Sequence, residues 1–518
     1  MGSVAKISEE KASSRIAGVA LAGLLKFIEE RRHTAFNDNG GFEAFEREVR
    51  KRFSEAEREF IGEELERLDV TLPEVVIDGV RHRRVVSGRG EYMTAAGPVI
   101  VRRHRYRAVG TNSESECPLE RRAGIVEGFF TPLAARMGLW AVTHLTPAES
   151  ESLFHELGGM KPSRSTLDRL PKGVSEKWEA RRKEWENALR TQEEAVVGAA
   201  VLAVSLDGVM APMKNGQREA RREQSLQEGK QTRGPAGYRE VGCGCVSHYD
   251  ENGERLRTVR NARMPESKKQ TLKRQLVAEV DHAFRQAPNL RLVKVADGAL
   301  DNWDFLAKDL PPGVEVVDFY HAAEHLKRAF DHAYGEASAK SRASFAEYRH
   351  VLLEVVGGVE KVIRTLTYHH KRKPRCGPLM QELGYFRRNR SRMDYARLRA
   401  QNLPIGSGVV EATCKTLVTQ RMKRSGQRWS TDGGQAILTF RALAQSDRFD
   451  AAWQKVSAEY RREVCVPANV VPINPKPDKP EPNRGYDVSL ANARGGHHVG
   501  DRIGGAVCGE PAWGVVLF

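Results

Sequence analysis

The spacing of apolar positions predicts helices in the first part of the chain, with one hairpin among them. Residues 42–68 carry apolar side chains at steps of three and four, which predicts an amphipathic helix with a charged outer face. This helix would pack on its own domain or on a second subunit. Residues 92–107 place a Gly-Pro pair between two β-rich runs, which predicts a hairpin. The basic second arm of the hairpin fits a solvated strand face as well as a phosphate contact.

Residues 146–170 predict two short helices around a glycine turn. Thr146 and Glu149 have the spacing of a capping box, and Ser163 can cap the second helix. Such a pair suggests a helix-turn-helix whose second helix, with Arg164, would enter a major groove, although any helical hairpin has the same pattern. A highly charged helix over residues 175–195 is predicted to follow as a connector.

Beyond residue 195 the pattern changes to apolar strands. The predicted order is β, β, β, α, β, α, β, α, which indicates an α/β core with a mixed sheet covered by helices. The RNase H-like fold has this order. Residues 322–402 have a helical pattern almost throughout. Beyond about residue 463 the chain is Pro- and Asn-rich and aperiodic, which predicts a disordered tail.

The charge of the chain favours a polyanionic partner. The 518 residues, enough for two to four domains, carry a formal net charge of +15. Residues 371–399 contain ten basic and two acidic residues, with Tyr385, Phe386 and Tyr395 interleaved. This segment suits a surface that grips a DNA backbone and stacks on bases. The DNA-binding candidates in it are Arg387, Arg388, Arg390 and Arg392.

Cysteine usage and the apolar runs bear on the compartment. The seven cysteines are an odd number scattered along the chain, which fits a reducing setting better than a disulfide framework. Cys243 and Cys245 are expected to alternate along a strand rather than bind zinc. The apolar run at residues 16–25 is too short to span a bilayer. We therefore expect a cytoplasmic protein without membrane contact, associated with the nucleoid when bound to DNA.

Two aspartates end apolar strands. Asp207 ends the first strand of the α/β part and Asp297 the fourth, and each is followed by glycine. These strands are neighbours in an RNase H-like sheet, so the carboxylates would face one another and require a positive charge between them. Oxygen ligands of this kind select Mg²⁺ or Mn²⁺, and two such ions about 3.5–4 Å apart can support phosphodiester cleavage. Taken singly, each aspartate could be a turn former.

A third carboxylate is predicted in residues 402–430. Glu411 falls in the first turn of a helix that Ser407 can cap and that continues through Leu417. A bland amphipathic helix is the alternative. Basic residues along this segment would grip phosphates beside the metal ligand. They are Lys415, Arg421, Lys423, Arg424 and Arg428.

Four motifs in order carry a family resemblance. The stretches LDGV, VADGALDNW, DFYHAAEHL and PIGSGVVEATCK…QRMKRSGQRW together resemble bacterial insertion-sequence transposases of the DDE class, specifically the ISKra type, over roughly residues 90–450. The resemblance implies Asp207, Asp297 and Glu411 as the catalytic and metal-binding triad. It also implies an N-terminal region that recognises terminal inverted repeats. Asp318 and His321 match the D-x-x-H signature of such families, as active-site support or as structural hydrogen-bonding groups.

The spacing of the triad agrees with a helical insertion before the glutamate. The two aspartates are 90 residues apart, and 114 residues separate Asp297 from Glu411. The expected organisation has a mainly α N-terminal DNA-binding region ahead of the catalytic core. Its parts are a helical and hairpin region (1–140), a helix-turn-helix-like segment with linker helix (141–192), an RNase H-like domain (193–321 and 403–450), the insertion (322–402) and a helix end with tail (451–518).

The expected function is a DNA transposase with two Mg²⁺ or Mn²⁺ ions. It would cleave phosphodiesters at element ends and direct the freed 3′-OH to target DNA, which needs metal ions and alignment rather than a covalent protein nucleophile. Its partner would be double-stranded DNA, both terminal inverted repeats and target, and pairing two ends implies a homodimer or larger assembly on DNA. The alternatives are a nuclease of the same fold without strand transfer and a non-catalytic DNA-binding protein derived from a transposase.

Overall fold

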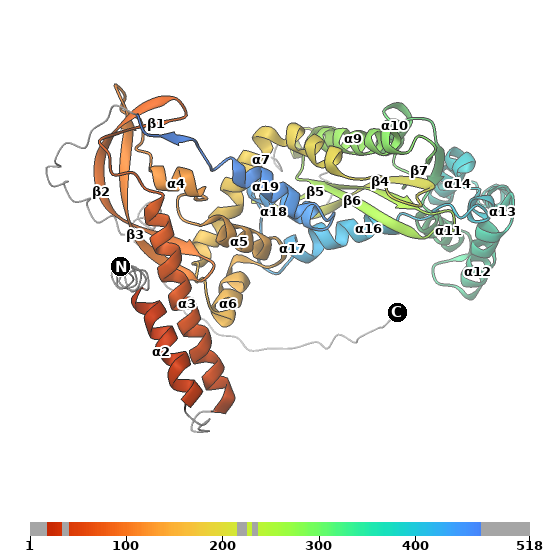
Figure 1. The fold of residues 1–518 in the computed structure, drawn as a ribbon. Coiled ribbons are helices and arrows are strands. Elements are labelled where there is room, and N and C mark those ends of the chain that lie inside the picture. Colours follow the sequence, from red (N-terminus) through yellow and green to blue (C-terminus); the bar gives the residue numbers. More distant parts are fainter. Residues whose placement is uncertain (1–17, 34–40, 215–224, 230–236, 468–518) are drawn as a thin grey trace, which may run out of the picture.

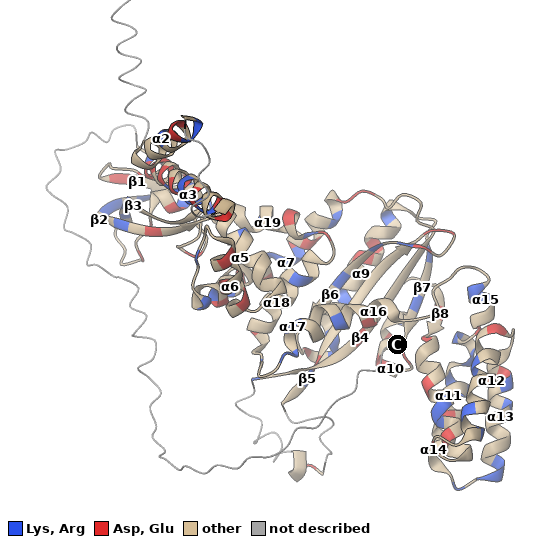
Figure 2. Cartoon of the chain, turned by 90° about the horizontal axis from the view of Figure 1, so that it is seen from below, with Lys and Arg blue, Asp and Glu red and all other residues tan. Residues whose placement is uncertain are grey.

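The computed structural model describes residues 18–33, 41–214, 225–229 and 237–467. The molecule is elongated, and Figures 1 and 2 show the same succession of parts from two directions. A four-stranded sheet with helices α2 (Val19–His33) and α3 (Gly41–Arg67) lies at one end, and a five-stranded sheet occupies the middle. A bundle of helices forms the other end. The chain is therefore a mixed α/β protein with two sheets flanked by helices.

The N-terminal region is mainly helical, as predicted, but it also contains a sheet of which only one hairpin was predicted. The strands run in the order β3-β2-β1-β9, and β2 (Val80–Thr94) pairs with β3 (Gly97–Ala108) over nearly their whole length. The predicted hairpin is confirmed, but its turn lies at residues 95–96, because Thr94 pairs with Gly97. The amphipathic α3 packs on β3. The sheet was missed because its two long strands carry many exposed basic residues, which hide the apolar alternation.

The edge strand β9 (Val464–Cys465) comes from the far end of the chain. It pairs antiparallel with β1 (Glu74–Ile77), although this stretch was predicted to begin a disordered tail. Two residues without periodicity give no strand signal of their own, and the pairing depends on the edge that β1 offers. Residues 468–518, the rest of the predicted tail, lie outside the described residues.

Helices α6 (Pro147–Leu157) and α7 (Arg164–Gln192) form the predicted helical pair. The capping box at Thr146 and Glu149 is present, and Ser163 accepts a hydrogen bond from the backbone N–H of Thr166. The second helix and the connector, predicted as separate helices, are one helix of 29 residues with a kink at Arg181. Buried side chains continue one face of α7 from the first turn into the connector, which explains the continuity. They are Leu167, Leu170, Val174 and Trp178.

The five-stranded sheet has the order β6-β5-β4-β7-β8. Strands β4, β5 and β6 pair antiparallel as consecutive hairpins, whereas β7 and β8 run parallel to β4. The predicted succession of strands and helices is confirmed for this part. In chain order the elements are β4 (Val201–Pro212), β5 (Tyr238–Tyr249), β6 (Arg255–Arg263), α9 (Gln270–Gln286), β7 (Arg291–Ala296), α10 (Leu300–Lys308), β8 (Val314–Val317) and α11 (Phe319–Tyr334).

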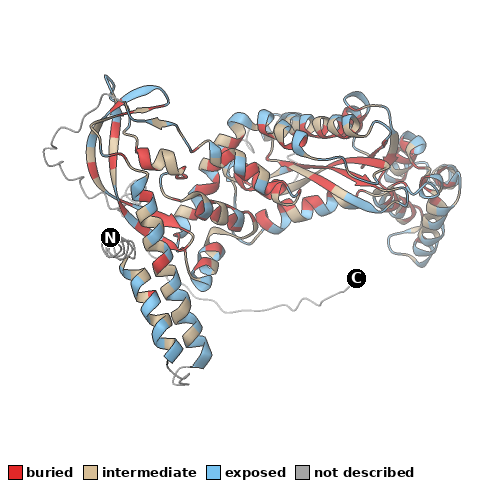
Figure 3. Cartoon of the chain, viewed as in Figure 1, coloured by how far each residue is buried: buried red, intermediate tan, exposed pale blue. Residues whose placement is uncertain are grey.

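The two faces of this sheet are covered by different helices, and the alternation along β5 shows how. Gly242 and Gly244 face α9, where a Cβ would meet Leu272 and Leu276 at 3.0 and 2.8 Å. Cys243 and Cys245 alternate with these glycines along β5, as predicted, and point to the opposite face of the sheet. They pack there with residues of α16 (Gly408–Thr413) and the turns after it. Figure 3 shows the strands of this sheet as buried.

The far end of the molecule is a helical bundle. Helices α12 (Ala339–Glu354), α13 (Gly358–Arg372), α14 (Gly377–Asn389) and α15 (Tyr395–Arg399) pack with α11. The predicted boundary at 321/322 is wrong, because α11 begins at the sheet and continues unbroken into the bundle. The predicted stacking surface is also wrong. Its aromatic residues, Tyr385, Phe386 and Tyr395, are buried in the core shared with the sheet.

The chain then returns to the sheet. Helix α16 continues through a π-type turn (Cys414–Thr419) into α17 (Gln420–Met422), and α18 (Thr431–Ala444) and α19 (Phe449–Ala458) follow. Helix α18 packs on β6 and on α7. π-Type turns are rare and often occur at functional sites, so this one marks the segment after Glu411.

His248 makes the stability of the sheet pH-dependent. It lies on β5 with 8% of its surface exposed, and burial, followed by the charge of Arg257, lowers its pKa to about 4 from the ordinary 6.5. The neutral ring is favoured in the folded state, so its contribution is present above pH 6.5 and is lost as the pH falls toward 4. One pKa unit corresponds to about 1.4 kcal/mol, which bounds the loss at roughly 3 kcal/mol. We expect urea denaturation at a series of pH values to show that the free energy of unfolding falls less steeply with decreasing pH for His248→Gln than for the unsubstituted protein. An equally steep fall for both proteins would contradict this role.

Candidate active site

Three aspartates lie in one row across three parallel strands. Asp297 and Asp318 directly follow β7 and β8, whereas Asp207, predicted to end its strand, lies inside β4, which continues to Pro212 along β5. Ser205 of β4 pairs with Val295 of β7, and Ala296 of β7 pairs with Val317 of β8. Asp207, Asp297 and Asp318 therefore lie level with one another across neighbouring strands, which are roughly 4.8 Å apart. The row lies toward the carboxyl edge of the parallel strands, and the rigid strands hold the side chains in fixed positions there.

Asp207 points to the face of the sheet that α16 covers. It pairs with Cys243 of β5, and its Oδ2 lies 3.8 Å from the Sγ of Cys414. Its Oδ1 accepts a hydrogen bond of 2.7 Å from the backbone N–H of Gly208. Burial raises the pKa of Asp207, and the neighbouring negative charge of Asp297 raises it further. The two predicted aspartates are thus close enough to repel one another.

Asp297 is fixed by the turn into α10. Its Oδ1 accepts hydrogen bonds from the backbone N–H of Ala299 (3.1 Å) and from the side-chain amide of Asn302 (3.0 Å). Its backbone carbonyl accepts one from the indole of Trp303 at 2.6 Å. Asn302 was missed from the sequence, since its distance of five residues from Asp297 carries no recognised motif. Asp301 and Asp304, acids of the same stretch, lie exposed on α10.

Asp318 is fully buried and both its oxygens are engaged. Oδ1 accepts hydrogen bonds from the backbone N–H (2.7 Å) and the ring Nδ1 (3.1 Å) of His321, and Oδ2 accepts one from the backbone N–H of Ser407. Burial alone would raise the pKa of Asp318, but these hydrogen bonds outweigh it and lower the pKa. Asp318 therefore connects the start of α11 to the segment that leads into α16.

His321 carries a positive charge within this cluster of acids. The hydrogen bond to Asp318 raises its pKa to about 9, against the effect of its partial burial, and Asp297 also raises it. At neutral pH the ring is protonated, so both nitrogens are donors. Nδ1 is committed to Asp318, and Nε2 is left to donate to an acidic group beside it.

Glu411 joins the row from 114 residues further along the chain. It lies in the first turn of α16, as predicted, and is exposed. Ser407 occupies the capping position, but its hydroxyl donates to Glu411 Oε1 at 2.8 Å instead of accepting from a backbone N–H, so the predicted cap is wrong. A backbone hydrogen bond of 3.0 Å from Phe319 to Ile405 ties this segment to α11. Ligand atoms of Asp318, His321 and Glu411 lie within 4.8 Å of one another.

The donor set of the site fits a hard divalent cation. Asp207, Asp297 and Glu411 each have one oxygen held by a local N–H or O–H donor. In the described residues no N–H or hydroxyl bonds to the second oxygen of any of them. Asp318 and His321 fit a metal ion less well, although their ligand atoms lie within 4.8 Å of that of Glu411. Both oxygens of Asp318 already accept hydrogen bonds, and the ring of His321 is protonated at neutral pH. Asp297 and Glu411 each have a free oxygen, and the second oxygen of Asp207 accepts only the weak thiol donor of Cys414. Three such carboxylates match Mg²⁺ or Mn²⁺.

The predicted DNA-binding residues divide into exposed and engaged side chains. Arg421 is only 1% exposed and donates to the carbonyl of Val142, so its prediction as a surface contact is wrong. Arg392 pairs with Glu315 at 2.6 Å, and Arg424 pairs with Glu149 at 2.5 Å. Arg390 is exposed but also pairs with Glu360 at 3.4 Å. The remaining candidates are exposed: Arg164, Arg387, Arg388, Lys415, Lys423 and Arg428.

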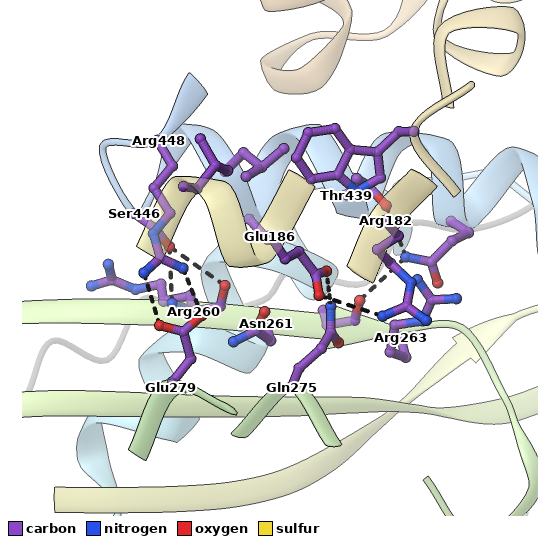
Figure 4. A pocket seen from close by; sticks show the side chains of 16 residues that line it. Arg182, Glu186, Arg260, Asn261, Arg263, Gln275, Glu279, Thr439, Ser446 and Arg448 are labelled. Carbon is purple, nitrogen blue, oxygen red and sulfur yellow. Dashed lines mark hydrogen bonds and ion pairs between the residues drawn. The ribbon is translucent and has the colours of Figure 1, made fainter. Parts of the chain in front are cut away.

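A small cavity beside α7 is structural in character. It measures about 30 Å³, and its lining groups come from α7, β6, α9 and α18 with the residues that follow it (Figure 4). Its lining includes a buried ion-pair network, in which Arg448 bonds Glu279 through two nitrogens at 2.8 Å and Arg190 adds a third bond at 3.1 Å. These charges hold α7 against the sheet. Asn261 Nδ2 and Gln275 Oε1 in the lining have no hydrogen-bond partner in the described residues, and a space of this size fits water rather than a larger ligand.

Comparisons with known proteins give no family. No protein-family model matches the chain, and no curated protein matches it. Among solved structures, the Drosophila P element transposase strand transfer complex aligns over 64% of this chain and 84% of that chain, at 11% identity and a TM-score of 0.22. That score does not establish a common fold, and the proposals below rest on the geometry of the chain itself. In the described part of the chain, no helix is both long and apolar enough to cross a membrane.

Proposed function

We propose that the chain is a DNA transposase of the DDE class, with Asp207, Asp297 and Glu411 as its metal-binding triad. One observation carries this proposal. Asp207 and Asp297 lie on neighbouring strands close enough to repel one another, and Glu411 has a ligand atom within 4.8 Å of those of Asp318 and His321 at the same part of the sheet. Each of the three proposed ligands keeps one oxygen free of N–H and hydroxyl donors in the described residues. A bound cation would relieve the repulsion between Asp207 and Asp297, which raises the pKa of Asp207 in addition to the effect of burial.

The strand order supports an RNase H-like catalytic domain. Three antiparallel strands are followed by two strands parallel to the first, which lies in the centre of the sheet. The bundle α11–α15 intervenes between Asp297 and Glu411, in the position expected for the insertion of the ISKra-type group. Both features agree with the four motifs that suggested this family.

The residues of the site suit phosphoryl transfer. A bound Mg²⁺ would supply a Lewis acid that activates a water and stabilises a leaving 3′ oxygen. Asp207 is held inside β4 and Asp297 directly after β7, while Asp318 fixes both His321 and the segment before Glu411. The protonated Nε2 of His321 is suited to donate to a phosphate oxygen. Direct attack by water or a 3′-OH would need these groups to align the reactants and requires no covalent protein nucleophile.

The test is an assay that separates cleavage from joining. Purified protein would be incubated with Mg²⁺, labelled duplexes taken from the DNA on either side of its gene, and a supercoiled plasmid. The proposal predicts labelled duplex covalently joined to plasmid through its 3′ end. Cleavage without joints would indicate a nuclease of the same fold, and binding without cleavage a non-catalytic DNA-binding protein; either result would overturn the proposal.

A further inference from the structure

A large cavity lies away from the row of carboxylates. It measures about 1060 Å³ and opens between the start of α7 with the preceding α6 on one side and the segment from α17 to α18 on the other. Its lining contains five basic residues and two acidic ones. Both acids are engaged, since Glu151 accepts from the backbone N–H of Arg164 at 2.9 Å and Asp168 pairs with Lys172 at 2.5 Å. The cavity therefore has an excess of positive charge.

Arg421 is the unusual group in this lining. It is 1% exposed, and its Nε and Nη2 share one acceptor, the carbonyl of Val142, at 3.3 and 3.2 Å. Its Nη1 is buried without a hydrogen-bond partner in the described residues. Burial and the charges of Arg424 and Arg441 lower the pKa of Arg421 to about 10, and the charges of Glu149 and Asp168 only partly offset this lowering. The guanidinium is therefore still charged at neutral pH. The guanidinium carbon lies 5.2 Å from the centre of the Trp429 ring, which partly compensates the charge. A buried cation without a full set of partners is costly, and a bound anion nearby would offset its charge.

Two helix N-termini add to the positive potential. Helices α7 and α18 begin at the cavity, with Ser163 to Ser165 of the first and Ser430 with Gly433 of the second in its lining. The N-terminus of a helix attracts anions through its free N–H groups and its dipole. These termini come from segments more than 250 residues apart, and they converge on the cavity that Arg421 lines.

The cavity is joined to the candidate active site through β4. The backbone N–H of Lys214 donates to Trp429 at 2.7 Å, and that of Trp429 donates to Pro212 at 3.0 Å, so the wall of the cavity pairs with the end of this strand. Asp207 lies on the same strand six residues before Met213. At about 3.3 Å per residue the separation is roughly 20 Å, close to the length of six base pairs of DNA.

We propose that this cavity binds phosphate groups of the DNA backbone and holds the duplex about six base pairs from the phosphodiester presented to Asp207. The inference rests on the proposed function, and it assigns the grip on DNA to Lys172, Lys214 and Arg428 rather than to the bundle, with the buried Arg421 adding positive charge behind them. Phosphate contacts of this kind fix position and register without reading sequence.

The experiment measures binding without cleavage. Fluorescence anisotropy with a 30-base-pair duplex and EDTA, over a range of salt concentrations, would compare the unsubstituted protein with the double variant Lys172→Gln/Arg428→Gln. The matched control is Arg387→Gln/Arg388→Gln on α14. Each lost phosphate contact lowers the salt slope by about one, so the cavity variant should lose roughly two from its slope and bind roughly tenfold more weakly.

The outcomes separate this inference from the proposed function. A cavity variant that loses no more affinity than the control would overturn the inference, whatever the joining assay shows. A selective loss in a protein that joins no DNA would keep the cavity as a DNA site and overturn only the transposase proposal. Arg421→Gln provides a further arm: if its circular dichroism melt shows a folded protein, weaker DNA binding is expected, and unchanged binding would exclude a contribution of the Arg421 charge.

Discussion

Replacing Asp297 with asparagine is expected to reduce Mg²⁺-dependent DNA cleavage and joining by about a thousandfold or more. The substitution keeps the size of the side chain and its Oδ1 acceptor, which holds Ala299 and Asn302, but removes the negative charge. Metal ions supply several kcal/mol of transition-state stabilisation, and roughly 4 kcal/mol corresponds to a thousandfold in rate. Initial rates of strand cleavage on labelled duplex would measure the loss.

The control for this prediction is four residues away. Asp301→Asn removes the same charge from an exposed position on α10, and it should leave the rate within about twofold because exposed substitutions rarely matter. If Asp297→Asn cleaved as fast as Asp301→Asn, the aspartate would be a turn former and not part of the reaction site.

Truncating Glu279 to alanine is expected to destabilise the fold by about 3–5 kcal/mol, the usual cost of breaking a buried ion pair. Glu279 is 6% exposed and receives two hydrogen bonds from Arg448 and one from Arg190. Removing it leaves both guanidinium groups buried with fewer partners, at the junction of α7 and the sheet (Figure 4). Urea denaturation followed by circular dichroism would give the change in the free energy of unfolding.

An exposed ion pair provides the comparison. Glu43 and Arg47 lie 2.7 Å apart on the surface of α3, and Glu43→Ala should cost less than about 1 kcal/mol. If the two substitutions lowered the free energy of unfolding equally, the network around Arg448 would not be what holds α7 against the sheet.

The middle of the molecule was the most predictable part from sequence. Apolar strand patterns that end in Asp-Gly identified β4 and β7, and the order of strands and helices followed from local periodicity. Glu411 was found because a glycine-containing turn and a helix start are local signals too. The row formed by Asp207, Asp297 and Asp318, by contrast, depends on the register between strands, which no single segment encodes.

Features that depend on long-range packing were missed. The predicted surface contact Arg421 is buried because α17 packs toward α5 (Pro132–His144), whose Val142 supplies the acceptor, and a basic residue in a basic segment gives no sign of this. The aromatic residues of 371–399 follow the buried face of a bundle and not a stacking surface. Strand β9 forms only because β1 offers an edge from the other end of the chain.

The most direct test of the metal-binding triad is a Mn²⁺ titration followed by electron paramagnetic resonance in the absence of DNA. Both Asp207→Asn and Glu411→Gln are predicted to weaken Mn²⁺ binding by at least about tenfold, because losing a charged ligand costs more than about 1.4 kcal/mol. The control Asp301→Asn is predicted to bind Mn²⁺ as the unsubstituted protein does. Mn²⁺ affinity that is unchanged in Glu411→Gln, or equally reduced in Asp301→Asn, would contradict the assignment of Asp207, Asp297 and Glu411 to one metal site.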